Sequence, residues 1–369
     1  MKILYGVQGT GNGHISRARA MARALQAYPG LEVQWLFSGR CPEQFFRMEA
    51  FGDYWWREGL TFAHRNGSID RLATARQLKP LRLVRDVKTL PVQNFDLVIT
   101  DFEPVTAWAA RRAGIDSVGL GHQYAFNFNI PAPRFNWLAR GIMRAFAPAQ
   151  TSLGMHWSPF GQPILPPIAQ AHGEAEKAKA ESGEPENRKP ENSEHILVYL
   201  PFEAQRQLVE QLSRLPQHFI VYGAPLDLPA ADNVLLKAPS LEGFQRDLAS
   251  AQAVICNSGF ELIAETLQLG KPILSRPLSG QFEQEANARA LAQLQLATVV
   301  PQINAAAIGA WLEKRPAGVT IQWPDVAGSI ARWLASGRRQ PVAQLAEELW
   351  QQVVADRSHI RKAADSALN

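Results

Sequence analysis

Cysteine and long apolar runs are scarce in this sequence. Its 369 residues include only Cys41 and Cys256, which excludes a disulfide framework and a metal site built from cysteine pairs. No apolar run approaches the roughly 18 residues that cross a bilayer. Residues 1–30 carry glycines and arginines where a secretory signal needs an apolar segment. We therefore expect a cytoplasmic protein.

The signatures of metal and nucleic-acid binding are also missing. The sequence has no Asp-x-Asp motif, no zinc-ligand spacing, no RNP signature and no run of Lys and Arg. Charge is nevertheless uneven, because residues 1–150 hold 19 Lys and Arg against 11 Asp and Glu, whereas the remainder holds 19 against 23. We expect no metal and no nucleic acid; an anionic acceptor or membrane surface suits the basic half.

The chain is long enough for two domains, and its pattern is that of α/β proteins. Short apolar runs alternate with helical patterns, and 46% of residues are hydrophobic and 20% charged. We place one domain at residues 1–168 and a second at 195–350. The charged, low-complexity stretch 169–194 predicts a flexible linker or insertion. Residues 351–369 predict a C-terminal helix.

The most informative stretch begins with a buried strand at 253–256 and a turn at Asn257-Ser258-Gly259. A helix is predicted from Phe260 to Leu269, with Gly270 after it as a C-terminal cap. Unpaired backbone N–H groups at such a helix start can hold a phosphate. An ordinary strand-helix-strand unit with solvated carboxylates explains the same pattern.

Four features of this stretch together resemble the donor site of GT-B glycosyltransferases. They are Ser-Gly after a strand, a Glu six residues after the Gly, Gly-x-Pro, and a Gln followed by Asn-Ala. The likeness is greatest to the family 28-like branch that contains the UDP-N-acetylglucosamine transferase of peptidoglycan synthesis. It implies two Rossmann-like, doubly wound parallel-sheet domains facing each other across a cleft. It also implies that Ser258 and Gly259 meet the diphosphate, Glu265 the ribose and Gln284 the sugar.

A glycine-rich turn follows the first predicted strand, Lys2 to Val7, and precedes a helix predicted from Ile15 to Ala27. It is neither a dinucleotide fingerprint, because no acidic residue ends the second strand, nor a P-loop, because Gly-Lys-Ser/Thr is absent. The resembling branch has a glycine-rich loop ending in His at this place. The resemblance therefore implies that Gly13 lies at the donor and that His14 is a base or orients substrate; a solvated His near the helix start is the alternative.

Two more polar groups follow buried strands of the first domain. Asp101 comes directly after the strand 95–100, where it either caps the next helix or orients a histidine. His122 and Gln123 follow the strand 117–120, and the resemblance implies that they face the acceptor. Since parallel strands end at one edge, we expect Asp101, His122 and His14 to converge there.

The sequence thus predicts a glycosyltransferase that moves a sugar, such as N-acetylglucosamine, from a UDP-sugar to an acceptor hydroxyl without metal or cofactor. The acceptor is expected to be lipid-linked or an anionic glycan. Residues 134–146 form a basic amphipathic pattern that suits peripheral docking on the inner face of a membrane or, equally, a solvated helix. Three alternatives stay open: a nucleotide-sugar hydrolase, a UDP-sugar 2-epimerase, and a non-catalytic nucleotide-sugar sensor.

Overall fold

The computed structural model describes residues 1–45, 47–60, 64–65, 68–69, 80–133, 137–169, 194–314 and 317–355. Most of the predicted linker, 170–193, and the end of the chain from 356, where a helix was predicted, lie outside these ranges, so the domain boundaries stay predictions. Within the described ranges, no helix has the length and apolar character needed to cross a membrane.

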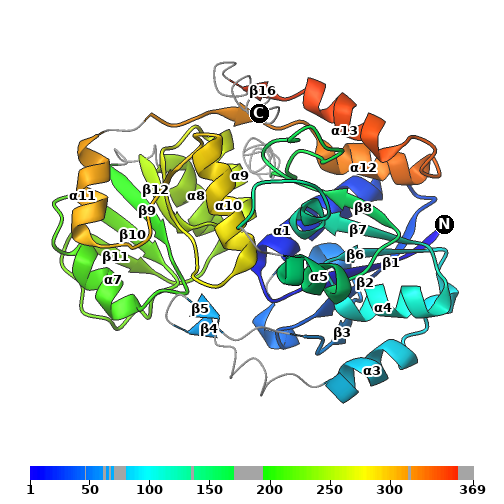
Figure 1. Ribbon diagram of the computed structural model, residues 1–369. Coiled ribbons are helices and arrows are strands. Elements are labelled where there is room, and N and C mark those ends of the chain that lie inside the picture. The colour runs from blue at the N-terminus through cyan, green and yellow to red at the C-terminus, as the bar shows by residue number, and fades with distance from the viewer. Residues whose placement is uncertain are drawn as a thin grey trace, which may run out of the picture.

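The first half of the chain forms a six-stranded, all-parallel sheet in the order β3-β2-β1-β6-β7-β8. Helices connect successive strands and cover both faces, as parallel crossovers require (Figure 1). The strands are β1 Lys2–Gln8, β2 Glu32–Ser38, β3 Trp55–Arg57, β6 Leu97–Asp101, β7 Ser117–Gly121 and β8 Thr151–Gly154. The helices are α1 Asn12–Gln26, α3 Pro80–Thr89, α4 Pro104–Ala113 and α5 Trp137–Phe146, with short 3-10 turns at Pro42–Gln44, Glu49–Phe51, Val92–Asn94 and His122–Asn127.

The second half repeats this plan with the order β11-β10-β9-β12-β13-β14, again all parallel. Its strands are β9 His195–Tyr199, β10 His218–Tyr222, β11 Val234–Lys237, β12 Ala253–Asn257, β13 Ile273–Arg276 and β14 Thr298–Val299. Its helices are α7 Gln205–Leu212, α8 Leu241–Ser250, α9 Phe260–Gln268, α10 Phe282–Gln293 and α11 Ala305–Glu313. Between β3 and α3 in the chain, the two-residue strands β4 His64–Arg65 and β5 Ser68–Ile69 pair antiparallel with each other as a separate sheet.

The last two helices, α12 Val326–Ala335 and α13 Val342–Gln351, return to the first half of the chain. Helix α12 packs on α1 (Figure 1), and Trp350 Nε1 donates to the carbonyl of Ile164 at 2.6 Å. Helix α13 ends at Gln351, and Val354–Ala355 forms strand β16, which pairs antiparallel with β15 Ile321–Gln322. The C-terminal helix predicted over 351–369 is therefore replaced by a strand at 354–355, and its remainder lies outside the described residues.

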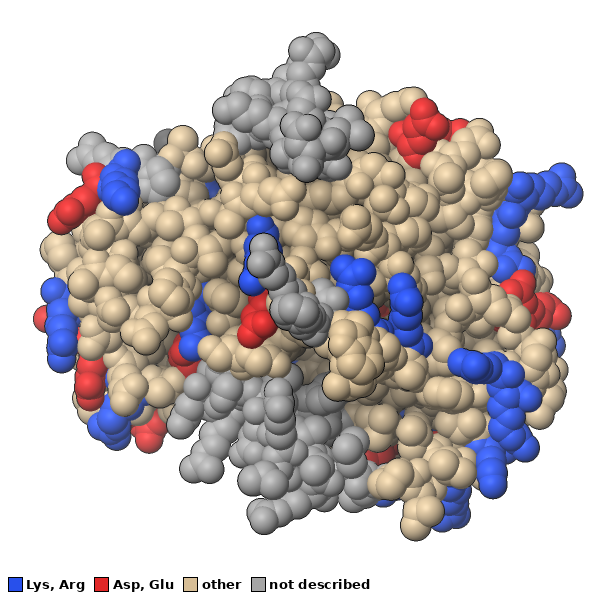
Figure 2. Space-filling model, in the orientation of Figure 1, with Lys and Arg blue, Asp and Glu red and all other residues tan. Residues whose placement is uncertain are grey.

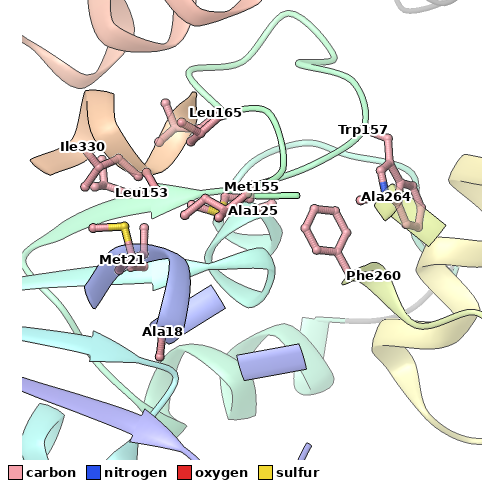
Figure 3. Close-up of a cluster of buried hydrophobic side chains, with 14 of the residues drawn as sticks. Ala18, Met21, Ala125, Leu153, Met155, Trp157, Leu165, Phe260, Ala264 and Ile330 are labelled. Carbon is pink, nitrogen blue, oxygen red and sulfur yellow. The ribbon is translucent and has the colours of Figure 1, made fainter. Parts of the chain in front are cut away.

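One apolar core extends across both halves. Alternate residues of β1 divide between the two faces of the sheet, so that Tyr5 joins the core shared with the second half while Leu4 packs under α4. Figure 3 shows Phe260 of α9 between Trp157 and Met155, at the junction. This continuous burial fixes how the carboxyl ends of the two sheets oppose each other.

Candidate functional site

The glycine-rich turn leads directly into α1, which begins at Asn12, three residues earlier than predicted. His14 therefore lies in the first helical turn, and Arg17 follows three residues later on the same face. A Cβ at Gly13 would lie 2.6 Å from Glu261 Oε2 of α9, so a larger residue there would displace the end of the Glu261 side chain. The helix tolerates this glycine, at a typical cost of about 1 kcal/mol relative to alanine, because it brings α1 against the second half of the chain.

His14 and Asp101 form a close pair at the carboxyl end of β6. The distance from His14 Nδ1 to Asp101 Oδ1 is 2.6 Å; the carboxyl is fully buried, whereas the imidazole keeps 15% of its side-chain exposure. The Asp101 carboxylate can only accept, so its contact needs the proton on Nδ1 and leaves Nε2 as the acceptor; Arg17 Nη2, itself a donor, lies 3.0 Å from the same Nδ1. Within the described ranges, Nε2 has no hydrogen-bond partner. The pair thus presents a basic nitrogen toward solvent.

Arg17 holds Asp101 from the other side. Its Nε donates to Oδ2 at 2.8 Å and its Nη2 to Oδ1 at 2.5 Å, with only 1% of the side chain exposed. Burial opposes ionisation of Asp101, but the charges of Arg17 and His14 keep the pKa of that carboxyl below its usual value. Burial also opposes the charge of Arg17, yet Asp101 and Glu261 raise its pKa. Asp101 is therefore anionic at neutral pH.

The alternative role of Asp101, capping the next helix, belongs to Glu103. The Glu103 carboxylate accepts from the backbone N–H groups of Val105 and Thr106 at 2.9 and 2.7 Å, as an N-cap does. Between the two acids, Phe102 has a φ of 53°, which turns the chain so that Asp101 points to His14 while Glu103 points to α4. Positive φ is uncommon for a bulky side chain and is often found at functional sites.

Helix α9 begins opposite this pair, at the turn that the sequence singled out. Gly259 is its N-cap without a side-chain hydrogen bond, and a Cβ there would meet open space. The Ser258 hydroxyl lies 2.8 Å from Ser275 Oγ and the whole residue is buried, so its contact with the diphosphate stays a prediction. Further along the helix, burial and the charge of Glu261 raise the pKa of Glu265 to about 7.

The remaining predicted residues lie in a joint between the two halves. His122 is buried; its Nδ1 lies 2.8 Å from the Met155 carbonyl and its Nε2 2.6 Å from Asn287 Oδ1. Gln123 donates to Glu283 at 3.1 Å. Gln284 is also buried, and its Oε1 accepts from the backbone of Leu278 at 3.0 Å. Acceptor contact by His122 and Gln123 and sugar contact by Gln284 stay predictions, because these polar groups bind protein partners here.

Three residues take part in these contacts without a predicted role: Arg17, Glu261 and Asn287. Arg17 stands at i+3 from His14, which places both on one helix face, and this spacing was a usable signal. Asn287 stands in the Asn-Ala of the donor pattern, but its contact was not predicted: it donates to the carbonyl of Ser258 at 2.9 Å. Among the described residues, no group of three or more His, Cys, Asp or Glu side chains is arranged to hold a metal ion.

Comparison with known proteins adds a family and a set of fold neighbours. The family described as Glycosyl transferase family 1 matches residues 1–316. A UDP-N-acetylglucosamine--N-acetylmuramyl-(pentapeptide) pyrophosphoryl-undecaprenol N-acetylglucosamine transferase from Methylorubrum extorquens (strain PA1) is 32% identical over 107 residues. That match covers 25% of this chain and only 29% of the relative.

Solved structures match over nearly the whole chain. A UDP-glucosyltransferase from Polygonum tinctorium has a TM-score of 0.57 at 14% identity, covering 100% of this chain and 98% of that one. The glycosyltransferase SnogD from Streptomyces nogalater has a TM-score of 0.51 at 16% identity, covering 95% and 99%. At these identities the likeness concerns the fold. Together with the two parallel sheets, it confirms the predicted GT-B architecture.

Proposed function

The chain belongs to glycosyl transferase family 1, and we propose that it moves a sugar from a UDP-sugar to an acceptor hydroxyl with His14 as general base. The observation that carries the proposal is the 2.6 Å contact between His14 and Asp101, which leaves Nε2 available beside the start of α9. UDP-N-acetylglucosamine is the first donor to test, because the partial curated relative is an N-acetylglucosamine transferase by name.

In the proposed reaction, Nε2 of His14 takes the proton of the acceptor hydroxyl. The oxygen attacks the anomeric carbon while the bond from that carbon to the diphosphate oxygen breaks, and UDP leaves with the electron pair. The anionic Asp101 stabilises the imidazolium that forms and keeps the proton on Nδ1. A single displacement of this kind inverts the anomeric configuration.

The donor is proposed to lie along α9. Its backbone N–H groups after Gly259 and its helix dipole favour the negative diphosphate. Glu265 lies about one and a half turns further along and would accept hydrogen bonds from the ribose hydroxyls. Because the helix terminus supplies the electrostatic stabilisation of the leaving group, we propose a reaction that proceeds without a metal or cofactor.

The acceptor is proposed to be lipid-linked, as the relative's name indicates for that protein, and the surface supports membrane contact. Trp137, Leu138 and Ile142 of α5 are 75%, 59% and 55% exposed, and Leu81 of α3 is 86% exposed. Figure 2 shows Lys and Arg side chains on the right-hand half of the molecule, which carries α3, α4 and α5 in Figure 1. Exposed apolar groups with basic neighbours suit the anionic headgroup region of a membrane.

The experiment is to incubate the protein with a panel of UDP-sugars, with and without lipid-linked and glycan acceptors, with and without EDTA. We expect UDP release that requires acceptor, an inverted product by NMR, and no effect of EDTA. Free sugar without acceptor would identify a hydrolase, and a 2-epimer would identify an epimerase. UDP binding with no turnover across the panel would contradict the proposal and indicate a sensor.

A further inference from the structure

Glu261 and Arg17 join the two halves of the chain directly beside the proposed base. Arg17 Nη1 donates to Glu261 Oε1, across 244 residues of sequence. Arg17 is 1% exposed and Glu261 21% exposed at the side chain. Gly13 lies against this contact, since a Cβ at that position would be 2.6 Å from the Glu261 carboxylate. Gly13, Arg17 and Glu261 thus form a single contact between α1 and α9.

The charges of this cluster determine how readily His14 accepts a proton. Asp101 and Glu261 carry two negative charges and Arg17 one positive charge, so the buried cluster has a net charge of −1 while His14 is neutral. When His14 takes a proton, the cluster becomes neutral, which low-dielectric surroundings favour. Without Glu261, Arg17 alone would neutralise Asp101, and proton uptake would leave an uncompensated positive charge.

We infer that Glu261 is a positioning residue that acts through Arg17 and completes the proposed base only when the two halves of the chain are together. Asp101, Arg17 and His14 all belong to the first half, whereas Glu261 arrives on α9, the helix proposed to hold the donor. The inference rests on the proposed transferase function. It adds that a residue of the donor-binding half sets the charge balance of a base in the acceptor-binding half.

Two other titratable groups face this cluster, and the first does not alter its charge. Tyr5 of β1 is buried beside Asp101 and Arg17; burial, followed by the charge of Asp101, raises the pKa of its hydroxyl well above the usual value. The phenol therefore stays neutral across the working pH range. The second is Glu265 of α9, whose pKa burial and the charge of Glu261 raise to about 7, so its charge is coupled to that of Glu261. The cluster itself holds the charges of Asp101, Arg17, Glu261 and His14, with Glu265 beside it.

The test compares Glu261→Gln with a matched control, Glu242→Gln. Glu242 also makes an ion pair between the halves, with Arg47, but both of these side chains are exposed, unlike the buried Arg17. For Glu261→Gln we expect kcat to fall about tenfold, the UDP dissociation constant to stay within about twofold, and the acid limb of the pH–rate profile to move to lower pH. Glu242→Gln should match the wild type in all three.

A second measurement is independent of turnover. With histidine labelled for NMR, and the His14 signal assigned by its loss in His14→Ala, the midpoint of its titration should move to lower pH in Glu261→Gln and stay unchanged in Glu242→Gln. An unchanged midpoint in folded Glu261→Gln would overturn the inference, even if transferase activity is found. A shifted midpoint in a protein with no turnover on the donor panel would instead sustain the charge coupling and overturn the proposed function.

Discussion

Asp101→Asn should reduce stability and turnover for two separable reasons, because one carboxylate serves both Arg17 and His14. Removing one partner of a buried ion pair typically costs about 3 to 5 kcal/mol. Glu261 still holds the far edge of the guanidinium, so we expect the lower end, about 3 kcal/mol. Since 1 kcal/mol corresponds to about 2 to 4 °C in Tm for domains of this size, the midpoint should fall by about 6 to 12 °C.

Turnover is to be measured well below that midpoint and normalised to folded protein. We expect a loss of at least about a hundredfold, because the neutral amide no longer stabilises the imidazolium. Asp116→Asn is the matched control: it removes an ion pair with Arg338 in which the side chains are 42% and 24% exposed. Its effect on the free energy of unfolding should stay below about 1 kcal/mol. An Asp101→Asn protein with wild-type Tm or wild-type turnover would refute this account of the carboxylate.

Three further predictions concern the donor and the membrane. Glu265→Ala should weaken UDP binding about ten- to a hundredfold by calorimetry, since a charge-assisted hydrogen bond contributes about 1.5 to 3 kcal/mol; unchanged affinity would remove it from the donor site. Because the pKa of Glu265 is raised to about 7, the folded state binds its proton more tightly than the unfolded state. Its contribution to the free energy of unfolding is therefore present below about pH 4.5 and is lost as the pH rises through 7. UDP affinity should instead rise over that upper range as the carboxylate ionises, and Glu265→Gln should show neither dependence. Trp137→Ser should weaken binding to anionic vesicles about tenfold, whereas Leu235→Ser, at an exposed apolar site of the second half, should leave it unchanged.

Much of the fold follows from local sequence. The strand that ends at Asp101 and the strand, turn and helix around Ser258 were predictable because short apolar runs followed by small residues have few other structures. Gly270 has a φ of 66° after α9, as expected for a C-terminal cap. The start of α1 was misplaced because glycine was read as turn, whereas Gly13 is helical and lies against Glu261.

The site itself was only partly predictable. The pairing of His14 with Asp101 depends on two elements that end at the same sheet edge, which topology implies. The contact of Arg17 with Glu261 depends on how two separate halves pack, and no pattern within either half encodes that distance. The strand at Val354–Ala355, where a helix was predicted, has a similar cause, because β16 pairs with a strand more than thirty residues earlier.

His14→Ala is the most direct test of the central claim that this imidazole is the base for glycosyl transfer. Turnover, UDP affinity and Tm are to be measured on the same preparation, using the donor and acceptor found with the wild type. The account predicts turnover reduced by about a hundredfold or more, with UDP affinity within about twofold of wild type. Normal turnover in the folded variant would contradict it, and a parallel fall in affinity would assign His14 to donor binding instead.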